Sequence, residues 1–153
     1  VQPMGLIITA TQYRAHAREL ARTFQVRLIE DAGLPPHEAL SVSAVRIVIC
    51  APIIDETTYA VALHEIGHIV APGGSVRDSS RHEGYGHELA LKMMEEDAAW
   101  IWARHVALEW TPLMDQVERW GRASYDHTRD SWNAAVAHVR ERLVDRLFPP
   151  FLY

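Results

Sequence analysis

The chain has 153 residues, of which 48% are hydrophobic and 23% charged, and its formal net charge at pH 7 is −5. This balance is typical of one globular domain with a buried core, and it disfavours nucleic acid or an anionic membrane as the main partner. The single cysteine, Cys50, allows no internal disulfide, so we expect a reducing, cytoplasmic compartment. No run reaches the length that spans a membrane, and the short apolar run over residues 4–10 lacks the basic segment of a signal peptide.

The first predicted element is a helix from Thr11 to Asp31. Thr11 can cap it, and Gly33 followed by Pro35 and Pro36 would end it. The apolar residues that recur at helical spacing are Leu20, Phe24, Leu28 and Ile29. We interpret this helix as scaffold packed against a sheet.

The sheet is predicted from the segment Val42 to Ile49, which is rich in valine and isoleucine. Residues 51–54 either extend this strand or form a second short one, and Pro52 confines that piece to an edge or a bend. An edge strand beside a metal-binding helix can hold an extended substrate by backbone pairing, but the same pattern also fits a purely structural strand.

A predicted helix over residues 57–70, capped near Asp55 and stopped by Pro72-Gly73-Gly74, contains the motif His64-Glu65-Ile66-Gly67-His68. Residues four apart share one helix face, so the two histidines can bind one metal ion. Glu65 stands beside the pair, where its carboxylate is free to take a proton from water. The motif therefore predicts a hydrolytic zinc site. The alternative is a pair of core histidines that are hydrogen-bonded to their neighbours.

Residues 72–86 are predicted to form a loop over this site. His82 in this loop and His87 directly after it repeat the motif with one residue too many, so they would not share a helix face. A long helix is expected from His87 or Glu88 to Glu109, with a core stripe of Leu91, Met94, Ala98, Ile101 and Val106.

Two more helices are predicted near the end of the chain. Thr111 and Pro112 begin one over residues 112–124, which Gly121 would end early. The other covers residues 130–147, and its apolar side consists of Trp132, Ala135, Val136, Val139, Leu143 and Leu147.

Catalytic zinc usually has three protein ligands, so a third ligand must be found. The class in which a third histidine follows in the pattern His-Glu-x-x-His-x-x-Gly-x-x-His is excluded, because Ala71 and Gly74 occupy those positions. A glutamate on the long helix remains. The candidates are Glu95 and Glu96, and helical periodicity leaves both open because each shares a face with apolar residues.

The segments Leu63-His64-Glu65-Ile66-Gly67-His68-Ile69 and Glu96-x-x-Ala99-Trp100-x-Trp102-Ala103 resemble the small zincin-like metallopeptidases of phages and bacterial mobile elements, which are similar to the gluzincin-type ImmA/IrrE family. The resemblance spans about residues 42–110. It implies zinc as cofactor, Glu96 as the third ligand, and a specific protein substrate such as a repressor or regulator. The chain departs from the family at Trp100 and Trp102, where many members carry asparagine and phenylalanine, and no helix-turn-helix segment is apparent.

Together these patterns predict a single α+β domain over residues 1–153, mainly helical and zincin-like, with a small β-sheet beside the metal-binding helix. The expected function is peptide-bond hydrolysis, with zinc on His64, His68 and Glu96 and with Glu65 as the general base. The candidates for stabilising the oxyanion are Tyr85, His87, Tyr125 and His127. The alternative function is a zinc-containing binding protein that sequesters a partner without cutting it. The oligomeric state stays open.

Overall fold

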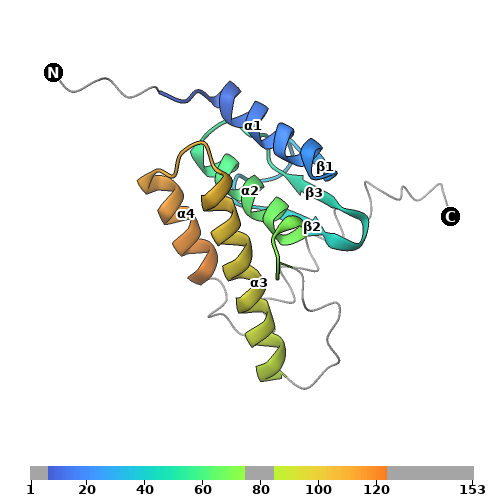
Figure 1. The fold of residues 1–153 in the computed structure, drawn as a ribbon. Helices are drawn as coiled ribbons and strands as arrows, with labels where there is room; N and C mark the ends of the chain where they lie inside the picture. The colour runs from blue at the N-terminus through green and yellow to red at the C-terminus, as the bar shows by residue number, and fades with distance from the viewer. Residues whose placement is uncertain (1–6, 75–84, 124–153) are drawn as a thin grey trace.

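The computed structural model describes residues 7–74 and 85–123 (Figure 1). Its elements in chain order are α1 (Ala10–Thr23), β1 (Arg27–Glu30), β2 (Ala39–Val42), the 3₁₀ helix η1 (Ser43–Val45), β3 (Ile47–Cys50), α2 (Glu56–Val70), α3 (Tyr85–Val106) and α4 (Pro112–Ala123). Helix α2 lies at the centre, with α1 and the sheet along one side and α3 and α4 along the other. The described residues therefore have the expected α+β arrangement, with a small sheet packed against α2.

The prediction of one long helix from Thr11 to Asp31 is wrong in its second half. Helix α1 ends at Thr23, and Gln25 then adopts a positive φ of 57°, which takes the chain out of the helical path. Residues 27–30 form strand β1, in which Leu28 pairs with Val48 of β3. The N-terminal cap is also different, because Thr9 and not Thr11 accepts the N–H of Gln12.

The predicted strand over residues 42–49 is instead the last residue of β2, the 3₁₀ helix η1, Arg46 and most of β3, which pairs antiparallel with β2. Strands β2 and β3 are joined by η1 and by Arg46, whose φ of 52° reverses the chain. The strand order is β1-β3-β2, and β1 runs parallel to β3. Residues 51–54 form no strand, and the N–H of Ile53 instead donates to the Glu30 carboxylate at 2.9 Å. Because residues 51–54 add no strand, the outer strands of the described sheet are β1 and β2.

Helix α2 agrees with its prediction within one residue. The Asp55 side chain accepts the N–H of Thr58 at 2.8 Å, and the Thr58 hydroxyl caps the Asp55 N–H in return at 3.1 Å. Tyr59, Leu63 and Ile66 are fully buried, so α2 is the core helix around which the other elements pack. Polar groups on this helix are consequently removed from water and need partners inside the protein.

Helix α3 exists where it was expected, but its predicted core stripe is wrong at Met94 and Ile101, whereas Val106 does pack against the core. Met94 and Ile101 are 59% and 54% exposed. The side of α3 that is buried consists of Glu95, Glu96, Ala99, Trp100 and Ala103. Small residues decide this orientation, because they let α3 approach α2 more closely than the larger apolar side chains would.

Helix α4 was predicted correctly. Thr111 caps it by accepting the N–H of Met114 at 3.2 Å, and the helix continues past Gly121 to Ala123. The predicted last helix over residues 130–147 lies outside the described residues. Within residues 7–74 and 85–123, every helix is too short or too polar to cross a lipid bilayer.

A partly buried hydrogen-bond network at Tyr59 links α1 to α2. The Tyr59 hydroxyl accepts the N–H of Leu108 at 2.9 Å and lies 2.7 Å from Nδ1 of His16. When His16 is a neutral imidazole with its proton on Nε2, Nδ1 accepts the hydroxyl hydrogen of Tyr59. Burial lowers the pKa of His16, which agrees with this neutral form.

The pKa of His16 is lower in the folded than in the unfolded protein. The contribution of His16 to the free energy of unfolding is therefore complete above about pH 6.5, and it is lost as the pH falls through the pKa of His16 in the folded protein. Urea unfolding at pH 7.5 and 5.5 should show His16→Gln losing less stability on acidification than wild type, by up to about 1 kcal/mol. Equal losses in the two proteins would contradict a neutral, accepting His16.

Candidate metal centre

The contact between α2 and α3 brings the predicted ligands together. His64 and His68 on α2 and Glu96 on α3 are all buried, with exposed fractions of 8%, 9% and 6%. The two Nε2 atoms lie 3.1 Å apart. One Glu96 oxygen lies 2.7 Å from Nε2 of His64, and the other lies 2.6 Å from Nε2 of His68. Two ring nitrogens and one carboxylate thus converge on a single point inside the protein.

This set of donor atoms fits a zinc ion. Two imidazoles and one carboxylate are a ligand set of catalytic zinc sites. At Zn–N distances near 2.1 Å, tetrahedral ligand atoms stand about 3.4 Å apart. The separations here, from 2.6 to 3.1 Å, are slightly shorter, so a small outward movement of the side chains makes room for the ion.

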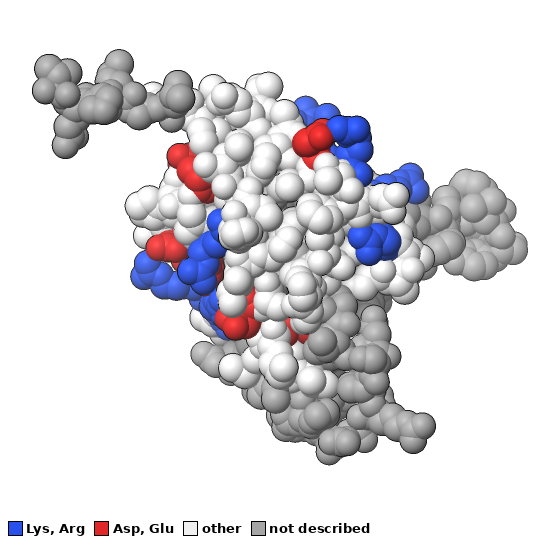
Figure 2. Space-filling view, in the orientation of Figure 1, with Lys and Arg blue, Asp and Glu red and all other residues white. Residues whose placement is uncertain are grey.

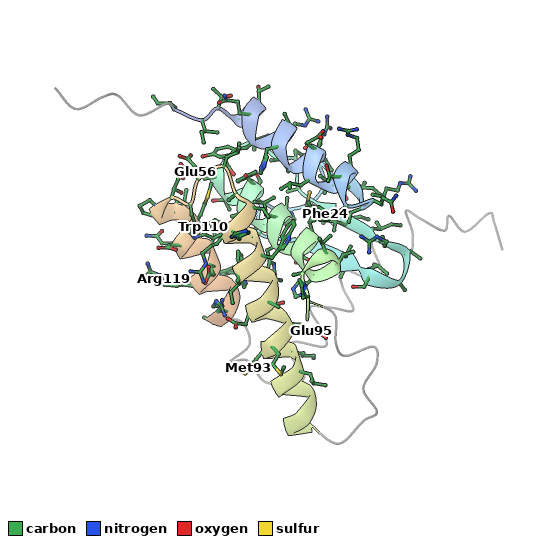
Figure 3. All side chains as sticks on the ribbon, viewed as in Figure 1. Phe24, Glu56, Met93, Glu95, Trp110 and Arg119 are labelled. Carbon is green, nitrogen blue, oxygen red and sulfur yellow. The ribbon has the colours of Figure 1, made fainter. Side chains whose placement is uncertain are left out.

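Glu95, the other candidate for the third ligand, is also buried, with 3% exposed. Figure 3 shows it on α3, beside the C-terminal end of α2. Glu96 is nevertheless the residue that offers one oxygen to each of His64 and His68. Of the two possibilities that helical periodicity left open, this geometry favours Glu96.

The Nδ1 atom of His68 forms a hydrogen bond with Gly74, in the chain that follows α2. Its Nδ1 lies 3.0 Å from the carbonyl oxygen of Gly74, so Nδ1–H donates to that carbonyl and leaves the lone pair of Nε2 directed at the cluster. A Cβ on Gly74 would lie 2.5 Å from the Gly67 carbonyl oxygen, so this close approach requires glycine. In the sequence, Gly74 predicts only the end of the helix, and nothing in the pattern indicates this contact with His68.

Trp100 is a second feature that the sequence analysis missed. Its buried ring stacks on His64, with ring centroids 4.0 Å apart and an angle of 15° between the planes. The indole rests in turn on α4, where a Cβ on Gly121 would lie 2.9 Å from it. The one available signal is that Trp100 follows Glu96 by four residues and so lies on the same face of α3. Three helices together fix the orientation of His64.

Glu65 contacts His64 on the side away from Glu96. Its Oε1 lies 3.3 Å from Nδ1 of His64, whereas Nε2 of the same ring faces Glu96. One ligand atom each from His64, Glu65 and His68 lies within 4.8 Å of the other two, so these three residues are close enough together to hold one metal ion. The candidate metal centre therefore comprises His64, Glu65 and His68 on α2, with the Glu96 carboxylate in contact with both histidines.

Opposing influences set the ionisation of these buried groups. Burial by itself raises the pKa of Glu96, but the charges and hydrogen bonds of His64 and His68 outweigh it and hold that pKa well below its usual range. Burial likewise raises the pKa of Glu65, and the contact with His64 lowers it overall. Both carboxylates are ionised at neutral pH, so Glu96 can bind a cation and Glu65 can accept a proton.

The close approach of the two helices that carry the site depends on Gly67. A Cβ there would lie 2.7 Å from the carbonyl oxygen of Ala99 and 3.1 Å from its Cα. In an exposed helix, replacing glycine by alanine stabilises by up to about 1 kcal/mol. Gly67→Ala should instead destabilise the protein by about 1–3 kcal/mol in urea unfolding, because the added methyl group forces α3 outward. A gain in stability would show that α3 does not pack as closely as described.

The residues proposed as oxyanion donors cannot be placed. Tyr85 and His87 lie in the first turn of α3, where side chains are not described, and Tyr125 and His127 lie outside the described residues. Comparison of the chain with protein-family models, with curated proteins and with solved structures found no match. The case for a metal centre therefore rests on the buried motif of His64, Glu65 and His68 and on the Glu96 carboxylate in contact with it.

Proposed function

We propose that the chain is a zinc-dependent peptidase that hydrolyses peptide bonds in a protein substrate. The observation that carries this proposal is the buried convergence of His64, His68 and both oxygens of Glu96, with the ionised Glu65 next to it. Structural zinc sites are usually closed by four protein ligands, often cysteines, whereas catalytic sites keep one position open for water or substrate. A site with these three ligands has such an open position.

The roles of the residues follow from their positions. Zinc, when bound, supplies a Lewis acid and lowers the pKa of a water molecule. Glu65 accepts the proton of the attacking water and passes it to the leaving amine. The Gly74 carbonyl and the Trp100 ring hold His68 and His64 in their ligand orientations, which limits the rearrangement needed on binding.

The substrate is expected to be an extended polypeptide. Strand β2 packs against α2 and is an edge of the described sheet, so its outer backbone groups can pair with a peptide that approaches the site. The resemblance to the ImmA/IrrE family further implies one specific protein, such as a repressor or regulator of a phage or mobile element.

The test is zinc-dependent cleavage of a proteome-derived peptide library by the full chain, with new termini identified by mass spectrometry. We expect cleavage at a restricted set of sequences, abolished by a chelator, restored by zinc, and absent from His64→Ala. A zinc-loaded wild-type protein that generates no more new termini than His64→Ala would contradict the proposal.

One observation favours a second function, a zinc-containing protein that sequesters its partner without proteolysis. The contact of Glu65 with Nδ1 of His64, at 3.3 Å, is also the position of a carboxylate that merely orients a metal-binding histidine. In that case Glu65 has no part in proton transfer, and the zinc stabilises the fold. The Glu65→Gln variant described in the Discussion separates the two functions.

A further inference from the structure

The outward side of α3 carries an apolar surface that the described residues leave open. Met94, Ala98 and Ile101 recur at helical spacing along it, and Met94 and Ile101 are more than half exposed. Together with the end of α2 they border a groove with a volume of about 470 Å³, lined chiefly by Ala71, Pro72, Met94, Ala98, Ile101 and Trp102. We call this surface the α3 groove.

The position of the α3 groove distinguishes it from the metal centre. The opposite side of α3 carries Glu96, Ala99 and Trp100, which are already buried against α2 and α4. Figure 2 shows charged side chains gathered over α4 and near α1, with a largely uncharged surface between them. A helix that is apolar on two sides is typical of a position between two packed neighbours.

The C-terminal end of α4 lies beside the α3 groove. Helix α4 ends at Ala123, and the adjacent Arg122 forms an ion pair at 2.9 Å with Asp97, which also lines the groove. Thirty residues follow Ala123, and the first six of them, 124–129, can span up to about 20 Å. The apolar residues that come next, at helical spacing, are Trp132, Ala135, Val136, Val139, Leu143 and Leu147.

We propose that residues 130–147 are the occupant of the α3 groove and dock their apolar side on Met94, Ala98 and Ile101. As a helix this segment would be about 27 Å long, which suits the length of α3. Docking would bury an apolar stripe on each partner that is costly to leave in water. It would also place α3 between α2 and this segment, and would cover the chain that follows α2.

A photo-crosslinking amino acid at position 101 of the full chain tests the proposal directly. We expect it to label residues 124–153 of the same chain, giving a product of monomer mass whose crosslinked peptide is identified by mass spectrometry. The matched control is the same probe at Val45, which is 58% exposed on η1 and should not label that segment. Crosslinks between two chains, or a position-101 probe that labels no residue of the segment, would overturn the proposal.

Limited proteolysis gives a second and independent readout. Trypsin cleaves after Arg129, which directly precedes the segment, and after Arg140, Arg142 and Arg146 within it. Ile101→Asp leaves the buried side of α3 intact but places a charge in the groove, so cleavage after these arginines should accelerate about tenfold, as the undocked population rises. Val45→Asp should cleave like wild type. Equal rates for Ile101→Asp and wild type, at equal zinc content, would overturn the proposal.

Discussion

Glu96→Gln should lower zinc affinity at least about 100-fold, because it removes the one charged ligand of the site. The two histidines remain, but a neutral amide is a much weaker partner for a cation than an ionised carboxylate is. Competition with a chromophoric chelator at neutral pH measures the change. Circular dichroism checks that the variant keeps its helices, so that loss of affinity is not loss of fold.

The matched control is Glu95→Gln, which makes the same chemical change one residue earlier, at a side chain that is equally buried. We expect its zinc affinity to stay within a few-fold of wild type. If Glu95→Gln is the damaging variant and Glu96→Gln is not, the ligand-bearing face of α3 is rotated by one residue from the one described.

Glu65→Gln should slow peptide hydrolysis by about 10²- to 10⁴-fold while the protein still binds zinc. The amide oxygen of glutamine can still accept the Nδ1–H of His64, so the orientation of that ring is preserved. What is lost is the ability to take up a proton. The variant therefore separates proton transfer from the positioning of a ligand.

Comparison of Glu65→Gln with wild type also decides between the two proposed functions. A peptidase predicts that the variant binds its target without cutting it, and so captures the substrate from a cell extract. If wild type and Glu65→Gln have the same biological effect in cells, proteolysis is not the function, and the sequestering protein takes its place.

Helix α2, which carries the motif, could be predicted because its capping residues, its apolar run and its later burial all agree. Asp55 supplies the cap, the apolar run supplies the burial, and the spacing of His64 and His68 fixes their common face without knowledge of any other element. The search for a third metal ligand also pointed to the following long helix, and Glu96 of α3 does lie in contact with both histidines.

Other features of the fold and of the site could not be predicted, because they depend on contacts between segments that are far apart in the sequence. Leu28 and Ile29 fit a helix as well as a strand, and their parallel pairing with β3 decides for the strand. Helix α3 has two apolar sides, and which of them faces α2 depends on the close approach at Gly67 and Ala99. The stacking of Trp100 on His64 requires the relative rotation of α2, α3 and α4, which no single segment encodes.

The measurement that tests the central claim most directly is the zinc content of the full chain purified without added metal. We expect one zinc ion per chain, lost in both His64→Ala and His68→Ala, with a lower melting temperature in each because metal binding stabilises the folded state. Less than about a tenth of an equivalent in wild type, with no uptake when zinc is added, would contradict a metal centre at His64, His68 and Glu96.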